Sequence, residues 1–266
     1  MTLVFFSLTA PGAYAESGPE AWSIWAVSDE SVETAIDHTA WGEFLGRYVQ
    51  PQESGINFVA YADVSPADRK SLQAYLERLT DQDPRQLRKA EQLAYWINLY
   101  NALTVEVILR NPDEKSIMDM GGGFFSPGPW SDKLIEIAGE SLGLDDIEHR
   151  ILRPIWRDRR IHYAVNCASM SCPNLAQVPY TAENVEEMFR VAETNYINHP
   201  RGVSFDARGR LNLSEIFSWY RADFANDEAE LLRYLSMHHA TAAVRLREHT
   251  GRVRYHYDWS LNTATH

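Results

Sequence analysis

Residues 89–109 read KAEQLAYWINLYNALTVEVIL and form the longest uninterrupted helical pattern in the chain. The segment contains neither glycine nor proline, and its apolar side chains are distributed around the whole helix axis. A helix that is apolar on all sides is a buried helix. We therefore expect this segment to be a central helix around which the other elements pack.

The segments outside this helix indicate a mixed α+β fold with more helix than strand. Apolar residues at helical spacing predict further helices over 35–49, 66–79, 145–156, 181–197 and 215–224. Shorter apolar or alternating runs predict strands over 56–62, 161–165 and 253–259. The expected architecture is one helix-rich α+β domain in which the buried central helix packs on a small, mostly antiparallel sheet.

The composition is that of an ordinary globular protein. The chain has 266 residues, of which 45% are hydrophobic and 23% charged, and this length buries enough surface to fold without a metal or a disulfide. The 37 acidic residues outnumber the 25 Lys and Arg, and the net charge of -12 argues against non-specific binding to nucleic acid or to an anionic membrane. The expected partner is a small-molecule or peptide substrate. The sequence indicates no cofactor and does not define an oligomeric state.

The first 15 residues resemble an export signal. Residues 3–10 are a short apolar run, and Ala13-Tyr14-Ala15 has the small-x-small pattern that signal peptidases cleave, although no basic residue precedes the run. We expect a signal peptide over residues 1–15 and a periplasmic or secreted protein. No later stretch has the roughly 18 to 20 continuous apolar residues that a spanning helix needs, so no integral membrane segment is expected in the mature chain.

Glu91, Asn98 and Asn101 are polar side chains within the apolar central helix. Glu91 and Asn98 are seven residues apart and share a face, and Asn101 lies about one turn further along. A buried polar group without a partner costs about 1 to 3 kcal/mol, so each of these side chains must be satisfied. They either hold neighbouring backbone in place, which is the more common role of buried amides, or line a functional site.

The second informative stretch is residues 160–173, RIHYAVNCASMSCP, which contains both cysteines of the chain. The pattern predicts a strand that runs into a turn of small polar residues, with Cys167 at the end of the strand. Alternation then places His162 on the face opposite Cys167, so the imidazole cannot reach the thiol unless the turn twists. Pro173 suits a first helical position, which would place Cys172 at a helix N-terminus.

A reactive cysteine needs a cation, a helix N-terminus or a paired imidazole to lower the pKa of its thiol. If His162 points away, the nearest alternative in the sequence is His149, on the predicted helix over 145–156. Glu148 and Glu91 are the candidate carboxylates that would orient this imidazole. The sequence thus leaves His149 and His162 as two candidate proton carriers.

Four separate motifs resemble the DUF547 domain family. They are 95–102 (YWINLYNA), 147–153 (IEHRILR), 162–173 (HYAVNCASMSCP) and 257–262 (YDWSLN). The resemblance implies a DUF547-like domain over residues 85–262, preceded by a helical N-terminal flank over 16–84. The family is uncharacterised, and a distant relationship to papain-like or transglutaminase-like thiol enzymes is the functional lead that goes with it.

On the first hypothesis the protein is a cysteine-dependent hydrolase or transferase that acts on an amide, ester or thioester. Cys167, or Cys172 in its place, attacks the carbonyl carbon, and a histidine carries the proton. Backbone N–H groups of residues 168–171 bind the developing oxyanion. Nearby side-chain amides and hydroxyls contact the substrate, and the candidates are Asn98, Asn101, Asn166, Ser169 and Ser171.

Two alternatives give the cysteines a structural role. A Cys167–Cys172 disulfide would stabilise the turn by about 2 kcal/mol, and the protein would then be a non-catalytic ligand- or peptide-binding module. The two cysteines, together with His149 and His162, also have the ligand types of a tetrahedral zinc site. The zinc hypothesis carries the least weight, because lone histidines are more often plain core or surface residues.

Overall fold

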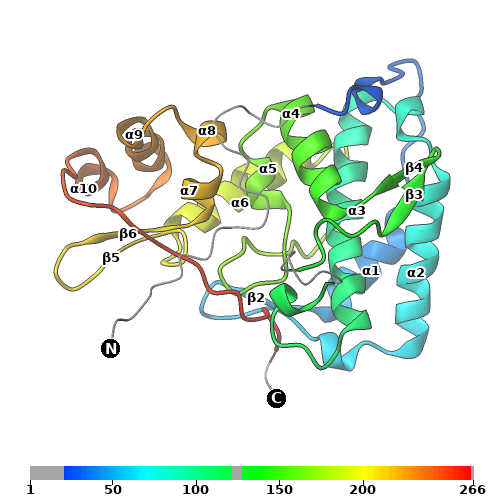
Figure 1. The fold of residues 1–266 in the computed structure, drawn as a ribbon, viewed down its shortest axis with the longest axis horizontal. Coiled ribbons are helices and arrows are strands. Elements are labelled where there is room, and N and C mark those ends of the chain that lie inside the picture. Colours follow the sequence, from blue (N-terminus) through cyan, green and yellow to red (C-terminus); the bar gives the residue numbers. More distant parts are fainter. Residues whose placement is uncertain (1–20, 122–127, 265–266) are drawn as a thin grey trace, which may run out of the picture.

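Helix α3 (Lys89–Arg110) is the centre of the fold, as its sequence predicts. In the computed structural model, which describes residues 21–121 and 128–264, every residue from Glu91 to Leu109 is buried. The helix packs against α2 (Pro66–Asp81) and against the π-helical segment η5 (Asp146–Leu152). It therefore connects the N-terminal helices to the elements that carry the predicted site (Figure 1).

Two helices dominate the described part of the N-terminal flank, and one of them, α2, packs on α3. Helix α1 (Thr39–Tyr48) packs on α2, which begins where the sequence supplies a cap. The Oγ of Ser65 accepts a hydrogen bond from the N–H of Asp68 at 3.1 Å, and Pro66 occupies the first helical position. These two helices account for the patterns read over 35–49 and 66–79.

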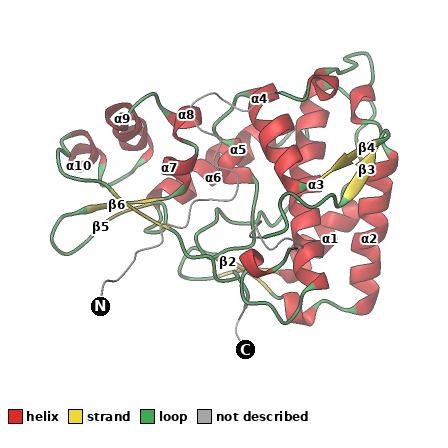
Figure 2. Cartoon of the chain, viewed as in Figure 1, coloured by secondary structure: helices red, strands yellow, loops and turns green. Residues whose placement is uncertain are grey.

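Shorter helices make up most of the rest of the chain. The α-helices are α4 (Arg153–Trp156), α5 (Ile161–Ala164), α6 (Val185–Asn198), α7 (Ile216–Trp219), α8 (Arg221–Phe224), α9 (Glu228–His238) and α10 (Ala243–Arg247). Single 3₁₀ turns are η1 (Ser23–Ala26), η2 (Tyr61–Asp63), η3 (Pro84–Gln86) and η4 (Ile117–Asp119). Helix dominates the described residues, which confirms the helix-rich α+β class (Figure 2).

The strands of the described residues form three small sheets. The antiparallel pairs are β1 (Val49–Pro51) with β2 (Asn57–Val59), and β3 (Ile135–Ile137) with β4 (Glu140–Leu142). The third sheet has the order β5 (Val203–Phe205), β6 (Leu211–Ser214) and β7 (Arg254–His256). Its first pair is antiparallel and its second is parallel, so the sheet is mixed.

The segment predicted as a strand over 161–165 is instead helical, because it forms α5 (Ile161–Ala164). The carbonyl of Asp158 accepts the N–H of Ile161 at 3.1 Å and so starts a series of turns. All four residues of α5 are buried, and a short buried run has no periodicity that distinguishes helix from strand. The chain becomes extended only at Val165.

The last residues of the described chain run back along the turn that holds Cys167 (red in Figure 1). The N–H of Met170 donates to the carbonyl of Ser260 at 2.8 Å, and the N–H of Asn262 donates to the carbonyl of Ala168 at 2.9 Å. The C-terminal segment therefore fixes the cysteine turn from the outside.

The predicted signal peptide, residues 1–15, lies outside the described residues. Within residues 21–121 and 128–264, no helix is both long and apolar enough to cross a bilayer. Export of the protein therefore stays a prediction.

Candidate functional site

A small pocket lies between α3, η5 and the cysteine turn, the three elements from which the sequence predicts a site. The structure brings both cysteines and both candidate histidines to it, since Cys167, Cys172, His149 and His162 all line the pocket. Tyr100 is the contribution of α3. The C-terminal segment and α7 close the remaining side with aromatic side chains.

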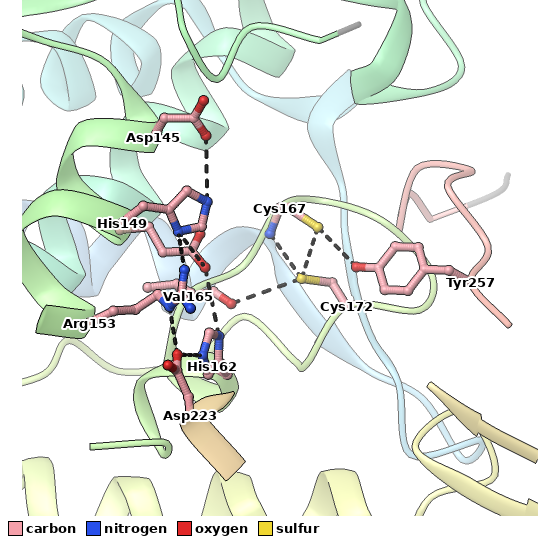
Figure 3. A network of polar contacts seen from close by, with 10 residues as sticks. Asp145, His149, Arg153, His162, Val165, Cys167, Cys172, Asp223 and Tyr257 are labelled. Carbon is pink, nitrogen blue, oxygen red and sulfur yellow. Dashed lines mark hydrogen bonds and ion pairs between the residues drawn. The ribbon is translucent and has the colours of Figure 1, made fainter. Parts of the chain in front are cut away.

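One side of the pocket, which we call the thiol wall, consists of Cys167, Ser169, Cys172 and Tyr257. The two sulfur atoms are 3.0 Å apart, and the Sγ of Cys167 lies 3.3 Å from the Oγ of Ser169 and 3.2 Å from the hydroxyl of Tyr257. Ser169 also donates to Tyr257 at 2.9 Å. Cys167 is thus surrounded by groups that can donate a hydrogen bond to its sulfur (Figure 3).

These contacts separate the acidities of the two cysteines. The hydrogen bond from the thiol of Cys172 is the largest influence and, with those from Ser169 and Tyr257, lowers the pKa of Cys167 to about 6 against the opposing effect of burial. Burial raises the pKa of Cys172 well above its usual value, and the neighbouring charge of Cys167 raises it further. Near neutral pH the wall therefore holds a Cys167 thiolate beside a Cys172 thiol.

Buried amides hold the cysteine turn in place. Asn101 on α3 donates from Nδ2 to the carbonyl of Ala164 at 2.9 Å, and its Oδ1 accepts the N–H of Asn166 at 2.8 Å. The side chain of Asn166 in turn accepts the N–H of Ala168 at 2.9 Å. Ala168 has a φ of 60°, a left-handed conformation that is unfavourable for a residue other than glycine. The amides and the C-terminal segment together maintain this strained residue directly after Cys167.

The other side of the pocket, which we call the imidazole wall, consists of Glu148, His149 and His162. An ion pair between Arg153 and Asp223 supports it from behind, with Arg153 Nε donating to Asp223 Oδ2 at 2.6 Å. The same carboxylate accepts a hydrogen bond from His162 Nε2 at 2.7 Å. Figure 3 shows these groups on one side and the sulfurs with Tyr257 on the other.

The partners of the two imidazoles fix their tautomers. Arg153 Nη1 lies 3.0 Å from His149 Nδ1, and because a guanidinium only donates, this nitrogen is an acceptor. The remaining proton of His149 is then on Nε2, which faces Asp145 Oδ1 at 3.7 Å. In His162 the N–H is on Nε2, toward Asp223, and Nδ1 faces Glu148 at 3.7 Å. Burial lowers the pKa of both histidines, so both are neutral near pH 7.

Glu148 is the group on this wall whose pKa lies near neutrality. Burial raises its pKa to about 7, against the attraction of Arg153 and a hydrogen bond from Tyr100, and the charge of Cys167 raises it further. Asp145, at the edge of the pocket, has its pKa raised to about 6, again mainly by burial. A group with a pKa near the working pH is the most effective proton carrier.

The two walls do not form a cysteine–histidine pair. Between described residues, no hydrogen bond joins either cysteine sulfur to an imidazole. The sequence predicted a strand in which His162 turns away from Cys167, and this expectation is wrong, because both residues line the same pocket. Their hydrogen bonds nevertheless stay within their own walls, His162 with Asp223 and Cys167 with Tyr257. The thiolate of Cys167 depends on hydroxyl and thiol donors instead.

The predicted oxyanion site at the backbone of residues 168–171 is wrong. The N–H of Ala168 is bound by Asn166, and those of Met170 and Ser171 donate to the carbonyls of Ser260 and Asp258. The N–H of Ser169 contributes to lowering the pKa of Cys167. All four donors already have acceptors, two of them carbonyls of the C-terminal segment and two of them side chains of the turn itself.

Several predicted site residues hold backbone rather than face the pocket. Asn98 donates to the carbonyl of Tyr180 at 2.7 Å and accepts its N–H at 3.0 Å, and Oε1 of Glu91 accepts the N–H of Ile36 at 2.7 Å. Ser171 accepts the N–H of Asp258 at 2.8 Å. Asn101 and Asn166 belong to the support of the turn described above. Of the predicted substrate contacts, only Ser169 lies against the reactive sulfur.

The structure also bears on the two structural roles considered for the cysteines, a disulfide and a zinc site. Cys167 and Cys172 are free cysteines in the structure, with their sulfur atoms in contact. Among residues 21–121 and 128–264, no group of three or more His, Cys, Asp or Glu side chains has the arrangement of a metal site. The zinc hypothesis therefore finds no support in the described part of the chain.

Three residues that matter here, Arg153, Asp223 and Tyr257, were not identified as site residues from the sequence. Arg153 is four residues after His149 on one helix, a spacing that does predict contact. Asp223 and Tyr257 join the site from 61 and 90 residues away from their partners, and no local pattern indicates either contact. The role of Glu148 as the near-neutral acid depends on its burial, which the sequence does not give.

The fold and the pocket define a helix-rich α+β domain in which a cysteine with a lowered pKa shares a pocket with a buried carboxyl and two imidazoles. Residues 84–197 match the family DUF547, described as a protein of unknown function, and the DUF547 resemblance is confirmed over this segment. The match includes α3 and both cysteines but covers less than half of the chain, and the motif over 257–262 lies outside it. No curated protein and no solved structure is significantly similar to the chain.

Proposed function

We propose that the protein is a cysteine-dependent hydrolase or transferase that acts on an amide, ester or thioester. The observation that carries this proposal is the Cys167 sulfur, which lines a pocket and has its pKa lowered to about 6 by donors on the same wall. A thiolate is the nucleophilic form of cysteine, and it is already present near neutral pH. Cys172, whose pKa is raised, is the donor and not the nucleophile.

The reaction runs through a thioester on Cys167. The thiolate attacks the carbonyl carbon, an S–C bond forms, and the bond from carbon to the leaving nitrogen, oxygen or sulfur breaks. Glu148, protonated in part near pH 7, supplies the proton that the leaving group takes. Water or an acceptor amine then attacks the thioester and returns its proton to Glu148, which restores the thiolate.

The histidines serve this reaction as neutral groups. Nδ1 of His149 already accepts from Arg153, so this nitrogen is not a base. His162 is oriented by Asp223 and turns Nδ1 toward Glu148. This assignment replaces the histidine proton carrier expected from the sequence with a carboxyl group that the histidines position.

Alkylation kinetics test the nucleophile. Iodoacetamide should modify Cys167 with a rate that rises through an apparent pKa near 6, while Cys172 stays unmodified in the native protein. Peptide mass mapping identifies the modified residue, and Cys167→Ser is the matched control. Equal slow modification of both cysteines at neutral pH would count against the proposal.

Acyl transfer tests the catalytic step itself. p-Nitrophenyl acetate should give a rapid burst of nitrophenolate and an acetyl adduct on Cys167, detected by intact mass. Glu148→Gln should slow release of the adduct, because the attacking water loses its proton acceptor. A Cys167→Ser variant with an unchanged burst would contradict the assignment.

The contact between the sulfurs also favours a second candidate, a non-catalytic ligand- or peptide-binding protein with a Cys167–Cys172 disulfide. This candidate fits the proposal that the signal-like residues 1–15 direct export to an oxidising compartment. The intact mass of protein purified without reductant decides between them, because a disulfide lowers the mass by two hydrogens. The mass of the mature N-terminus tests cleavage after Ala15 in the same measurement.

A further inference from the structure

The groups that line the pocket and can carry charge near neutral pH are all acids, and Glu148 is ionised there only in part. Asp145, Glu148 and the Cys167 thiolate all line it, and among the described residues that line the pocket none is a lysine or an arginine. The nearest guanidinium, that of Arg153, is bound to Asp223 behind the imidazole wall. The two histidines in the lining are neutral, so they do not offset these negative charges.

The carboxylate of Asp145 is the negative group best placed to meet a ligand. Its side chain is 24% exposed, whereas that of Glu148 is 8% exposed. The contact that the structure gives its Oδ1 is His149 Nε2, at 3.7 Å, which is too long for a strong hydrogen bond. Lys133 is close enough to lower the pKa of Asp145 slightly, but its ammonium group is paired with Asp146.

Four aromatic rings in mutual contact form part of the pocket lining. Trp219 and Trp259 stack with ring centres 5.6 Å apart, and Tyr257 lies 4.8 Å from Trp219 and 4.5 Å from Trp259. Trp130 meets the edge of Trp259 at 5.7 Å. All four rings line the pocket, so a ligand that reaches Cys167 passes along aromatic surface.

Aromatic faces combined with carboxylates are the chemistry that binds an alkylammonium group. A cation over a ring face gains about 0.5 to 2 kcal/mol, and more when water is excluded. The protein already uses this contact beside the pocket, where the guanidinium of Arg153 lies 4.5 Å from the centre of the Tyr220 ring. The net charge of -12 adds a general attraction for cations.

We propose that the substrate of this pocket carries a positively charged alkylammonium group, which binds between Asp145 and the aromatic rings of Trp130, Trp219, Tyr257 and Trp259 while Cys167 attacks the neighbouring carbonyl. The inference rests on the proposed function only for the attack of Cys167 on the carbonyl. Binding of the cation itself requires the pocket and not the reaction.

Three methanethiosulfonates of similar size but different charge test the inference. The reagents carry a trimethylammonioethyl, an ethyl or a sulfonatoethyl group. The Cys167 thiolate attacks the sulfenyl sulfur, a new S–S bond forms, and methanesulfinate leaves with the electrons of the broken S–S bond. Loss of the free Cys167 thiol reports this first step, whether or not Cys172 later displaces the group.

Each rate is divided by the rate of the same reagent with free cysteine, which removes the intrinsic reactivity. We expect the cationic reagent to exceed the ethyl reagent by roughly tenfold, and the anionic reagent to be slower than both. Asp145→Asn should reduce this preference several-fold. Asp113→Asn removes the same charge at an exposed turn and should retain the preference, which separates the pocket from the net charge of the protein.

The outcomes for the two proposals are distinct. Equal normalised rates, or the fastest reaction with the ethyl or sulfonatoethyl reagent, would overturn the cation inference and leave the thiolate intact. Slow reaction with all three reagents at neutral pH would overturn the thiolate proposal, and the ratio between reagents would still report on the cation. An unchanged preference in Asp145→Asn would remove Asp145 from the binding site and overturn the inference as stated.

Discussion

The thiol wall and the imidazole wall face one pocket but control charge in opposite ways. On the thiol wall, hydrogen bonds from Cys172, Ser169 and Tyr257 exceed the effect of burial and favour the anion. On the imidazole wall, burial is the largest influence, so both histidines are neutral and the pKa of Glu148 is raised to about 7. The side chain that carries the negative charge is thus set by the donors around it, and not by residue type alone.

The groups that set the charges in this pocket differ from those expected for a reactive cysteine. A paired imidazole is the usual source of a cysteine thiolate, and the sequence places two histidines near Cys167. Here hydroxyl and thiol groups favour the thiolate, and in the proposed reaction the proton for the leaving group comes from a buried carboxyl. Predictions that disturb one wall at a time test whether the two are independent.

The largest effect is expected from Arg153→Met, on the imidazole wall. The substitution removes the donor to His149 and the partner of Asp223, and breaking a buried ion pair costs about 3 to 5 kcal/mol. Because the Asp223 side chain is 22% exposed, we expect a loss of about 3 kcal/mol in the free energy of unfolding, measured by urea denaturation.

A matched control for this prediction is Arg190→Met. Arg190 pairs with Glu187 on the surface, and both side chains are 64% exposed, so the loss should be below about 1 kcal/mol. The apparent pKa of Cys167 should be the same in both variants. Similar losses of stability in the two variants would mean that the Arg153–Asp223 pair does not organise the wall.

The second effect is a dependence of stability on pH that Glu148 causes. Its pKa is about 7 in the folded protein, against an ordinary value of 4.5 in an unfolded chain, so its contribution is complete below about pH 4 and is lost as the pH rises through about 7. The loss amounts to about 3 kcal/mol, and Glu148→Gln should abolish it, as urea denaturation at a series of pH values will show.

Two other carboxylates, Asp223 and Asp145, also contribute to the pH dependence of stability. The pKa of Asp223 is lowered by His162 and Arg153 in spite of burial, so its contribution is present above its unfolded pKa and is lost only in acid. The raised pKa of Asp145 acts in the same direction as that of Glu148 and should leave a weaker slope in the variant. Glu187→Gln, on the exposed surface, should keep the full slope. A slope unchanged in Glu148→Gln would place the near-neutral proton elsewhere.

The sequence predicts the scaffold of this site better than its chemistry. Helix α3 is evident because apolar residues on all sides of a long, glycine-free segment have no other stable arrangement. The helical conformation of residues 161–165 is not evident from the sequence, because a buried run of five residues fits a helical turn as well as a strand. The segment becomes helical because a series of turns begins at Asp158, and these turns are held by the surrounding core.

The sequence names Cys167, His149 and His162 as candidates, but it predicts neither that His162 shares the pocket of Cys167 nor the partners of the three side chains. Residue types and short spacings identify groups that can react, whereas a pKa depends on burial and on donors distant in the sequence. Tyr257 reaches Cys167 only because the C-terminal segment pairs with the cysteine turn. The same pairing occupies two of the four backbone donors that the sequence suggested for an oxyanion, those of Met170 and Ser171.

The third effect concerns the thiol wall, where Cys172→Ala removes the donor with the greatest influence on Cys167. A hydrogen bond to a charged group contributes about 1.5 to 3 kcal/mol, which corresponds to a rise of about 1 to 2 units in the pKa of Cys167. The pH dependence of iodoacetamide alkylation measures this rise. Cys172→Ser keeps a donor at the same place and should retain most of the shift, and an equal rise in both variants would contradict the prediction.

The smallest effect is expected from Tyr257→Phe, because the thiol wall can compensate for it. Ser169 donates to Tyr257 at 2.9 Å and lies 3.3 Å from the Cys167 sulfur, so without the Tyr257 hydroxyl it can turn its proton to the thiolate. We expect a rise of less than about 1 unit in the pKa of Cys167, measured by thiolate absorbance in the ultraviolet. The Tyr257→Phe, Ser169→Ala double variant should show a rise greater than the sum of the two single variants, because each donor replaces the other. Additive rises would mean that the two hydroxyls act on the sulfur independently and that no donor on this wall is interchangeable.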